Sequence, residues 1–356
     1  MQRWVGVLAA VVASTWAAAA DGAEPVKIRC GMGVPTVQAL TLNVAIGEYL
    51  GYYKAEGLSL TLYGMGTNTA TLQALANGTN QVSVVVAGYL LPLAAKGESP
   101  PVKVFYNYTP KFKYDVVVNP DSPVKTFEDL KGKAIGLPAF GHASYPIVKA
   151  LARYAGWDPE KDLRLVAVGF GPTAGSALRE KRVDGYFAGD TDFALLETQG
   201  FAVRFLKIKP PAELDGIGGF YIGAMEDWIR KNPKLAVGVG RGIAKGTIFA
   251  KANMEAAARV FMALYPESVP KGMSREEGVK NIAAIARSRS VNWVRDGQKR
   301  WGEILKKEWE NEVKFLDLES KIPDVTRFFT NEFIDEANKF DAQKIADQAK
   351  TFTMRD

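Results

Sequence analysis

The stretch LSLTLYGMGTNTATLQALANGTNQVSVVVAG, residues 58–88, holds one complete strand–helix–strand pattern. Residues 58–63 alternate apolar and polar side chains as a strand does, and residues 64–66 form a Gly-Met-Gly turn. Helical apolar spacing follows around Leu72, stops at an Asn-Gly pair, and is succeeded by an apolar strand over residues 82–88. This order predicts a helix that connects two parallel strands.

The same order of elements occurs a second time further along the chain. Residues 134–137 read as a strand, residues 144–154 as a helix and residues 163–168 as another strand. A Gly-Phe-Gly turn then matches the Gly-Met-Gly turn, and a strand over residues 183–189 completes the copy. The first copy begins with a strand over residues 26–30, so each copy is a βαβαβ unit. Because 356 residues exceed one average domain, we expect an α/β fold with two lobes.

The two Gly turns lie where a parallel sheet binds its ligands. In such sheets the ligand sits outside the carboxyl ends of the strands, beside loops that enter helices. Glycine allows a positive φ and a close approach of the backbone, so we expect each lobe to contribute one side of a shared cleft. Neither turn continues as G-x-G-x-x-G, since Thr69 and Ala174 occupy the sixth position. A nucleotide-binding fingerprint is therefore absent, and a purely structural role for each turn stays open.

Residues 1–20 have the pattern of a cleaved signal peptide. Arg3 is the one charge before an apolar, Ala-rich run, and small residues at 18–20 offer a cleavage site before Asp21. A retained membrane anchor is the alternative interpretation. Cys30 is the single cysteine, so no disulfide can form within the chain and a lipid-anchored cysteine is not expected. We expect a mature protein that is exported to the periplasm.

The composition argues against nucleic-acid binding and against enzymatic chemistry. The formal net charge of +6 is spread over helices that carry both signs, such as residues 179–182, and no dense basic stripe occurs. The chain has no G-x-S-x-G motif, no P-loop and no Cys, His or acidic cluster with metal-ligand spacing. His142 is the only histidine. We therefore expect no nucleic-acid partner, no cofactor, no metal and no catalytic residues.

Two segments are candidates for carrying the chain between the lobes. Residues 106–113 are rich in aromatic and turn-forming residues, and the Gly-rich residues 216–221 offer a return path. Two such crossings make a hinge, so we expect the lobes to close on a ligand. Beyond Met225 the apolar spacing becomes helical, and residues 275–349 predict amphipathic helices that pack on the first lobe or bridge both.

Two longer stretches resemble a known family. VAIGEYLGYYKAEGLSLTLYGMGTNTATLQALANG at 44–78 contains a Gly-Tyr-Phe-like turn, a Glu-Gly-Leu strand start and an Ala-Leu-x-x-Gly helix. DSPVKTFEDLKGKAIGLPAFG at 121–141 contains a Leu-Lys-Gly-Lys step before a strand. This set resembles the substrate-binding proteins of nitrate, sulfonate and taurine ABC importers and the related thiamine pyrimidine-precursor binders. The resemblance covers roughly residues 26–265.

The resemblance implies a type 2 periplasmic binding fold. In that fold two α/β lobes are joined by two hinge crossings, here followed by a C-terminal helical segment. The implied organisation is a signal peptide at 1–20, lobe 1 at 26–107, lobe 2 at 108–215, and a return to lobe 1 with C-terminal helices at 216–356. The implied partners are a small-molecule ligand and an inner-membrane ABC permease, and we expect a monomer.

The family's binding loops carry over to specific positions of this chain. Bulky Phe140 and His142 stand where sulfonate binders have small hydroxyl residues, so the resemblance favours a larger, planar organic ligand with an anionic or strongly accepting group. His142 and Ser144 could instead serve the loop and the helix cap, and about half of the aromatic residues could be core. The implied ligand-binding residues are Val34, Pro35, Thr36, Thr67, Asn68, Gly88, Tyr89, Phe140, Gly141, His142, Ala143, Ser144, Phe170, Gly189 and Asp190.

Three functions compete. The resemblance favours an exported solute-binding protein that delivers a small organic ligand to an ABC importer. The alternatives are the ligand-binding subunit of a tripartite carrier or sensor system, or an enzyme of thiamine pyrimidine metabolism on the same fold. The enzyme of that fold needs a cysteine-rich stretch, which Cys30 alone does not supply.

Overall fold

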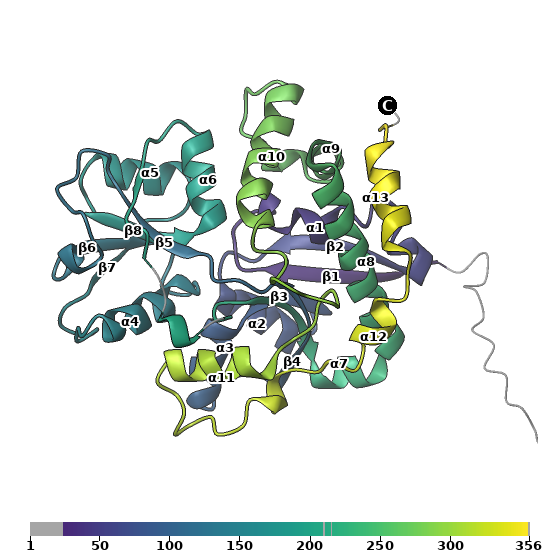
Figure 1. Cartoon of the computed structure of the whole chain (residues 1–356), viewed down its shortest axis with the longest axis horizontal. Helices are drawn as coiled ribbons and strands as arrows, with labels where there is room; N and C mark the ends of the chain where they lie inside the picture. Colours follow the sequence, from purple (N-terminus) through teal and green to yellow (C-terminus); the bar gives the residue numbers. More distant parts are fainter. Residues whose placement is uncertain (1–23, 209–210, 215, 355–356) are drawn as a thin grey trace, which may run out of the picture.

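The computed structural model describes residues 24–208, 211–214 and 216–354. The predicted signal peptide, residues 1–20, lies outside these residues. The described chain forms two five-stranded sheets with flanking helices, at opposite ends of an elongated molecule (Figure 1). We call the first sheet with its helices lobe 1 and the second sheet with its helices lobe 2. The predicted two-lobe α/β architecture is thereby confirmed.

The sheet of lobe 1 has the strand order β2-β1-β3-β10-β4. The strands β1, β2 and β3 of the first repeat pair in parallel, whereas β10 runs antiparallel between β3 and β4. The bounds are Val26–Met32 for β1, Leu58–Gly64 for β2, Val82–Val86 for β3, Val102–Thr109 for β4 and Phe220–Met225 for β10.

The sheet of lobe 2 repeats this arrangement with the order β7-β6-β8-β5-β9. Here β6 is parallel to β7 and β8, and β5 runs antiparallel between β8 and β9. The predicted second copy of the βαβαβ unit therefore forms the same three parallel strands as the first. The bounds are Tyr114–Val118 for β5, Ala134–Leu137 for β6, Arg164–Ala167 for β7, Gly185–Gly189 for β8 and Arg204–Phe205 for β9.

Helices connect the strands and form most of the C-terminal part. In lobe 2, α4 lies on one side of the sheet and α5 and α6 lie on the other (Figure 1). The α-helices are α1 Leu42–Ala45, α2 Asn68–Ala76, α3 Ala87–Ala95, α4 Ser144–Tyr154, α5 Pro172–Arg179, α6 Asp190–Thr198, α7 Glu226–Lys231, α8 Pro233–Ala252, α9 Met254–Leu264, α10 Arg275–Ser290, α11 Lys306–Phe315, α12 Ile334–Ala337 and α13 Ala342–Lys350. The 3-10 turns are η1 Ala39–Thr41, η2 Lys54–Glu56, η3 Glu128–Leu130, η4 Ala212–Leu214, η5 Pro266–Ser268 and η6 Thr326–Phe328.

One strand is shorter than its sequence pattern suggests. The apolar run 82–88 predicts a strand to its end, but β3 stops at Val86 and α3 begins at Ala87. Gly88 therefore lies in the first helical turn, against lobe 2, where an added Cβ would lie 2.7 Å from Glu312 Oε1 and 3.3 Å from Ile147. A continuous apolar run cannot distinguish a buried strand from a buried helix, which explains the difference.

The chain crosses between the lobes twice, and the two crossings touch. It leaves lobe 1 after β4 and enters β5, and it returns between β9 and β10. The Lys113 ammonium of the first crossing donates to the Gly218 carbonyl of the second, and the Gly218 N–H donates to Glu312 Oε2 of α11 at 2.5 Å. Burial raises the pKa of Glu312 to about 7 and lowers that of Lys113. The hinge region is thus a buried, hydrogen-bonded cluster.

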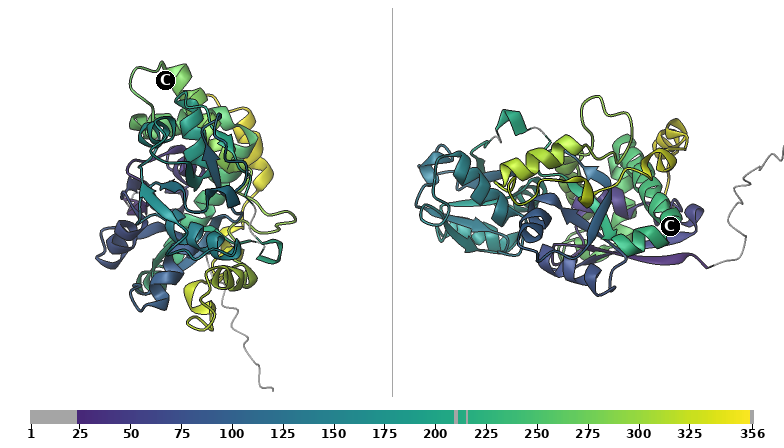
Figure 2. Two further views of the ribbon diagram at one scale, coloured as in Figure 1. Left: turned by 90° about the vertical axis from the view of Figure 1, so that its left-hand side faces the viewer. Right: turned by 90° about the horizontal axis from the view of Figure 1, so that it is seen from below.

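The C-terminal helices bridge both lobes. The helix α10 packs against α9 and η1 of lobe 1 and against α6 of lobe 2. On the other side, Arg153 of α4 donates to the Leu316 carbonyl at 3.0 Å, and Tyr154 stacks on Phe315 with ring centroids 5.7 Å apart. Figure 2 shows α11 from below, alongside both lobes. Within the part of the chain that the structure describes, no helix has the length and apolar character needed to span a membrane.

Candidate ligand-binding site

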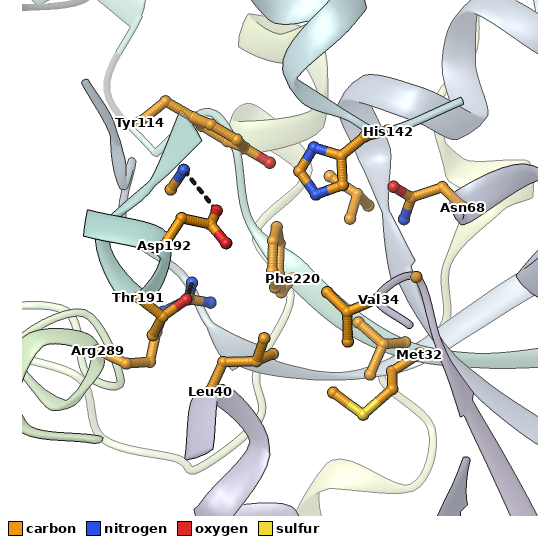
Figure 3. Close-up of a pocket in the computed structure, with 14 residues that line it drawn as sticks. Met32, Val34, Leu40, Asn68, Tyr114, His142, Thr191, Asp192, Phe220 and Arg289 are labelled. Carbon is orange, nitrogen blue, oxygen red and sulfur yellow. Dashed lines mark hydrogen bonds between the residues drawn. The ribbon is translucent and has the colours of Figure 1, made fainter. Parts of the chain in front are cut away.

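A pocket lies between the two lobes, at the carboxyl ends of β1, β3 and β8 (Figure 3). It has about 460 Å³ of empty space, including the part open to solvent. Its position is the one where open parallel sheets bind ligands. Lobe 1 contributes Met32, Gly33, Val34, Leu40, Asn68, Val84, Val86 and Phe220, lobe 2 contributes Tyr114, His142, Gly189, Thr191 and Asp192, and α10 contributes Arg289.

Four of the residues predicted from the sequence line this pocket: Val34, Asn68, His142 and Gly189. The others do not line it, and their contact with a ligand stays a prediction. Phe140, predicted as an aromatic wall, is 53% exposed, with its ring edge-on to Tyr145. The predicted residues outside the lining are Pro35, Thr36, Thr67, Gly88, Tyr89, Phe140, Gly141, Ala143, Ser144, Phe170 and Asp190.

The two Gly turns brace the loops beside the pocket and are not part of its lining. In lobe 1, the Gly66 N–H donates to the Val34 carbonyl at 3.0 Å. Gly64 packs so closely on this loop that an added Cβ would lie 2.4 Å from the Pro35 carbonyl oxygen. In lobe 2, the Gly169 N–H donates to the Pro138 carbonyl at 3.2 Å. The repeated turn therefore positions the loop of the neighbouring strand in both lobes.

Asn68 joins the lobes at one edge of the pocket. Its backbone N–H donates to the Gly141 carbonyl at 3.0 Å, and its Oδ1 accepts from the Ala143 N–H at 3.0 Å. Thr67 caps α2 by accepting the Ala70 N–H at 3.2 Å, which fixes the start of the helix that carries Asn68. These contacts hold the lobes in a closed arrangement.

His142 is a neutral histidine with a defined tautomer. Its Nδ1 accepts the Ser144 N–H at 3.2 Å and lies 2.7 Å from Ser144 Oγ, so the ring proton is assigned to Nε2. Burial lowers the pKa of His142 to about 4, which keeps the ring uncharged. Figure 3 shows the ring directed into the pocket. His142 therefore satisfies the N-terminus of α4 and lines the pocket, and its contact with a ligand stays a prediction.

Asp192 is the carboxylate of the pocket. Its Oδ2 accepts the Gly189 N–H at 3.0 Å, which closes the first turn of α6 (dashed line in Figure 3). Burial raises its pKa to about 6, although the Gly189 N–H and the charge of Arg289 oppose the rise. The lobe 2 side of the pocket therefore offers an acceptor that gains a proton in mildly acidic solution.

Arg289, at the end of α10, is the cation of the pocket and is only 2% exposed. Its Nε donates to both oxygens of Asp190, at 2.8 and 3.0 Å, and its Nη2 donates to Thr191 Oγ1 at 3.2 Å. Asn292 supports the pair by donating to Asp190 Oδ2 at 2.7 Å. Among the described residues, Arg289 Nη1 is buried and has no hydrogen-bond partner. The carboxylate of Asp190, a predicted ligand residue, thus forms an ion pair with Arg289.

Two aromatic rings form flat walls. Phe220 packs against two basic side chains, with the Arg289 guanidinium carbon 4.9 Å and Lys113 Nζ 4.0 Å from its ring centroid. Tyr114 stacks on Phe187 with centroids 5.8 Å apart, and its buried hydroxyl has no hydrogen-bond partner among the described residues. The described residues contain no group of three or more His, Cys, Asp or Glu side chains that could hold a metal ion.

Sequence reasoning missed Tyr114, Asp192, Phe220 and Arg289. Tyr114 directly follows one predicted crossing and Phe220 lies within the other, so a signal for a position near the hinge existed. For Asp192 the signal was its place in the first turn of a helix after a strand end. The sequence around Arg289 did not indicate a pocket residue, because α10 carries charged side chains at many positions. Arg289 is buried only because α10 packs against lobe 2.

A family model and a known protein match the chain. The family model described as NMT1/THI5 like matches residues 41–257, which is more than half of the chain. The chain is 27% identical over 335 residues to the riboflavin-binding protein RibY of Chloroflexus aurantiacus, covering 90% of each protein.

Two solved structures share the fold. One, from Bordetella bronchiseptica, has a TM-score of 0.69 at 22% identity and covers 89% of this chain and 98% of that one. The other is the periplasmic aliphatic sulphonate binding protein SsuA of Escherichia coli, with a TM-score of 0.60 at 18% identity and coverage of 89% of this chain and 92% of that one. At these identities the structural likeness shows the fold alone.

Proposed function

The chain belongs to the NMT1/THI5-like family, and on this premise we propose that it is an exported solute-binding protein. In this proposal the two lobes capture a small planar organic ligand in the pocket between them and deliver it to an inner-membrane ABC importer. The predicted signal peptide at residues 1–20 accounts for export to the periplasm.

The observation that carries the proposal is the lining of the interlobe pocket. Flat walls from Phe220 and Tyr114 accompany a few convergent polar groups, namely His142, Asp192 and Arg289. Small-molecule sites have this composition. A buried donor without a partner costs about 1–3 kcal/mol, so the free nitrogen of Arg289 favours a state in which a ligand atom accepts from it.

The ligand class that we propose is a planar heteroaromatic compound with acceptor oxygens. The relative named as riboflavin-binding makes riboflavin the first compound to test. The 460 Å³ of empty space includes open solvent, and the cavity volume itself is about 30 Å³, far below the usual range of about 300–1,000 Å³ for a ligand site. A three-ring ligand therefore requires the pocket to widen from this arrangement.

A small anion such as a short sulfonate or nitrate is the second candidate, and Arg289 is the observation that favours it. Its charge is already balanced by Asp190, at 2.5 Å, and the carboxylate of Asp192 lines the same pocket. Moving an anion from water into this pocket would cost desolvation free energy. No unpaired positive charge among the lining residues would offset that cost. The polar groups therefore favour a ligand that carries acceptor and donor atoms without a full negative charge.

Binding without turnover is part of the proposal. The chain lacks the motifs of nucleophilic and metal-assisted catalysis, which supports this role over an enzyme of the same fold. Incubation of the protein with riboflavin, followed by denaturation and mass spectrometry of the released compound, should return riboflavin unchanged. A modified product would favour the enzyme.

The deciding experiment is a thermal-shift and fluorescence titration with riboflavin, a pyrimidine, an aromatic carboxylate, an alkyl sulfonate and nitrate. Native mass spectrometry of freshly purified protein would detect a co-purified ligand. We expect a planar compound to stabilise the protein and to decrease its radius of gyration in small-angle scattering. Stabilisation by nitrate or a short sulfonate alone would contradict the planar-ligand proposal.

A further inference from the structure

We propose that Arg289 couples ligand binding to closure of the lobes. In this inference its Nη1 donates to an acceptor oxygen of the ligand while its Nε and Nη2 hold Asp190 and Thr191 of lobe 2. The inference rests on the proposed function, because it assigns a regulatory role to one residue of the same pocket.

The Arg289–Asp190 contact crosses from one lobe to the other. Arg289 is in the last turn of α10, and α10 packs on α9 and η1 of lobe 1 (Figure 1). Asp190 is the first residue of α6 in lobe 2, and its backbone N–H donates to the Lys113 carbonyl at 2.9 Å beside the hinge. A rotation that separates α10 from α6 must therefore break this contact.

The guanidinium geometry gives its two edges separate partners. The Nε–H and one Nη2–H of an arginine point from the same edge, and here Asp190 occupies that edge. Nη1 lies on the other side of the planar group and donates to no described residue. Because arginine keeps its proton at any relevant pH, this buried donor cannot be relieved by deprotonation.

Asp190 has little capacity for a ligand of its own. Its oxygens accept from Arg289, from Asn292 Nδ2 at 2.7 Å and from the Thr191 N–H at 2.8 Å. Arg289 is therefore the member of the pair that can contact both the ligand and the opposite lobe. Figure 3 shows Arg289 beside Thr191, on the same side of the pocket as Asp192.

Coupling follows from these shared contacts. A ligand shifts an open–closed equilibrium only by the difference in its affinity for the two states. An acceptor on Nη1 fixes the plane of the guanidinium, and this orients the Nε edge toward Asp190. At the same time the rest of the ligand faces His142 and Asp192 of lobe 2. The ligand and Asp190 therefore bind the same rigid group cooperatively in the closed state.

The test uses riboflavin as the probe with three variants. Arg289→Lys keeps the charge but has a single nitrogen, which cannot serve both edges. Asp190→Asn keeps Arg289 and removes the charged partner. Arg287→Lys is the matched control, because Arg287 is on the same helix, is exposed, and is 3.9 Å from Glu255. Riboflavin affinity is measured by fluorescence quenching, and closure by the ligand-induced decrease in the radius of gyration.

We expect Arg289→Lys to weaken riboflavin binding by about tenfold or more and to abolish the decrease in the radius of gyration. Asp190→Asn should lose most of the decrease with a smaller loss of affinity, and Arg287→Lys should behave as wild type. Wild-type affinity in Arg289→Lys would overturn the inference. Weakened binding with an unchanged decrease would overturn the coupling.

An experiment without ligand tests the contact between Arg289 and Asp190 independently of the proposed function. A double-mutant cycle between Arg289→Lys and Asp190→Asn, measured by chemical denaturation without ligand, should show a non-additive interaction. Additive effects would overturn the contact between the lobes. A wild-type protein that binds no riboflavin would contradict the proposed ligand, and the cycle would still decide whether Arg289 holds Asp190. If Arg289→Lys does not fold, Asp190→Asn and Asn292→Ala provide the same readouts with Arg289 in place.

Discussion

The two lobes share one strand order but present different walls to the pocket. Lobe 1 contributes mainly apolar side chains, including Met32, Leu40 and Val84, with Asn68 as its polar exception. Lobe 2 contributes the hydrogen-bonding groups His142 and Asp192, together with Tyr114 and Thr191. Two lobes with the same strand order can therefore present different kinds of side chain to one pocket. We infer that lobe 1 sets the shape of the site and that lobe 2, with Arg289 of α10, sets its hydrogen bonding.

The largest expected effect is on stability and lies in the apolar wall. Met32 is fully buried in β1, so Met32→Ala should lower the free energy of unfolding by about 2–5 kcal/mol through lost burial and a cavity. Chemical denaturation measures this change. Val26→Ala on the same strand is the control, because Val26 is 48% exposed and should change stability by less than about 0.5 kcal/mol. Equal effects of the two substitutions would contradict a packed lobe 1 wall.

The second prediction concerns pH and lobe 2. The folded pKa of Asp192, about 6, is above its ordinary value of 3.8, so its contribution to stability falls as pH rises from about 4 to about 6. The folded pKa of His142, about 4, is below its ordinary value of 6.5, so its contribution falls as pH decreases from about 6.5 to about 4. Over this range the two groups oppose each other.

Comparison of Asp192→Asn with wild type should isolate the contribution of Asp192, because His142 contributes equally to both proteins. The difference in free energy of unfolding between Asp192→Asn and wild type should rise by about 2 kcal/mol from pH 4 to pH 6.5, since each pKa unit corresponds to about 1.4 kcal/mol. Taking the difference cancels the contribution of Glu312, whose pKa is also raised. Met32→Ala is the control, and its difference from wild type should not depend on pH. A pH-independent difference for Asp192→Asn would contradict the burial of an ionisable group in lobe 2.

The third prediction separates the pocket from its surroundings. His142→Phe keeps a ring and removes the Nε2–H donor, so it should weaken riboflavin binding by about 1–3 kcal/mol if the ligand's acceptor is left without a partner. Phe140→Ala should leave the affinity unchanged, because Phe140 is exposed and does not line the closed pocket. Isothermal titration measures both. The reverse order of effects would restore Phe140 as the ligand wall that the sequence predicted.

The fold followed from the sequence where local signals agree with the packing. Gly and Pro mark both ends of residues 134–137 and 144–154, and β6 and α4 have these same bounds. The site residues could be predicted only in part, because the sequence of a loop does not determine the direction of its side chains. Phe140 and His142 are two residues apart, and one is exposed while the other is buried.

The remaining site residues depend on contacts between distant segments. Arg289 is buried because α6 of lobe 2 packs on α10, and no pattern within α10 distinguishes it from exposed Arg287. Phe220 reaches the pocket because β10 inserts antiparallel beside β3, which is a property of the whole sheet. Such positions can be found from a structure but not from the periodicity of a single segment.

The smallest effect compares one glycine from each Gly turn, the last glycine of the lobe 1 turn and the first glycine of the lobe 2 turn. Gly66 has φ +81° with open space where a Cβ would lie, whereas Gly169 has φ +77° and would bring a Cβ to 2.6 Å from Thr173 Oγ1. Gly66→Ala should therefore cost about 1–2 kcal/mol from the left-handed backbone alone. Gly169→Ala should cost more than this, because Thr173 donates to the Phe170 carbonyl at 2.8 Å and would have to give up that position. Thermal and chemical denaturation of the two variants measure the order. If both cost the same, the Thr173 side chain relaxes freely, and the backbone at Gly169 is no more tightly packed than the backbone at Gly66.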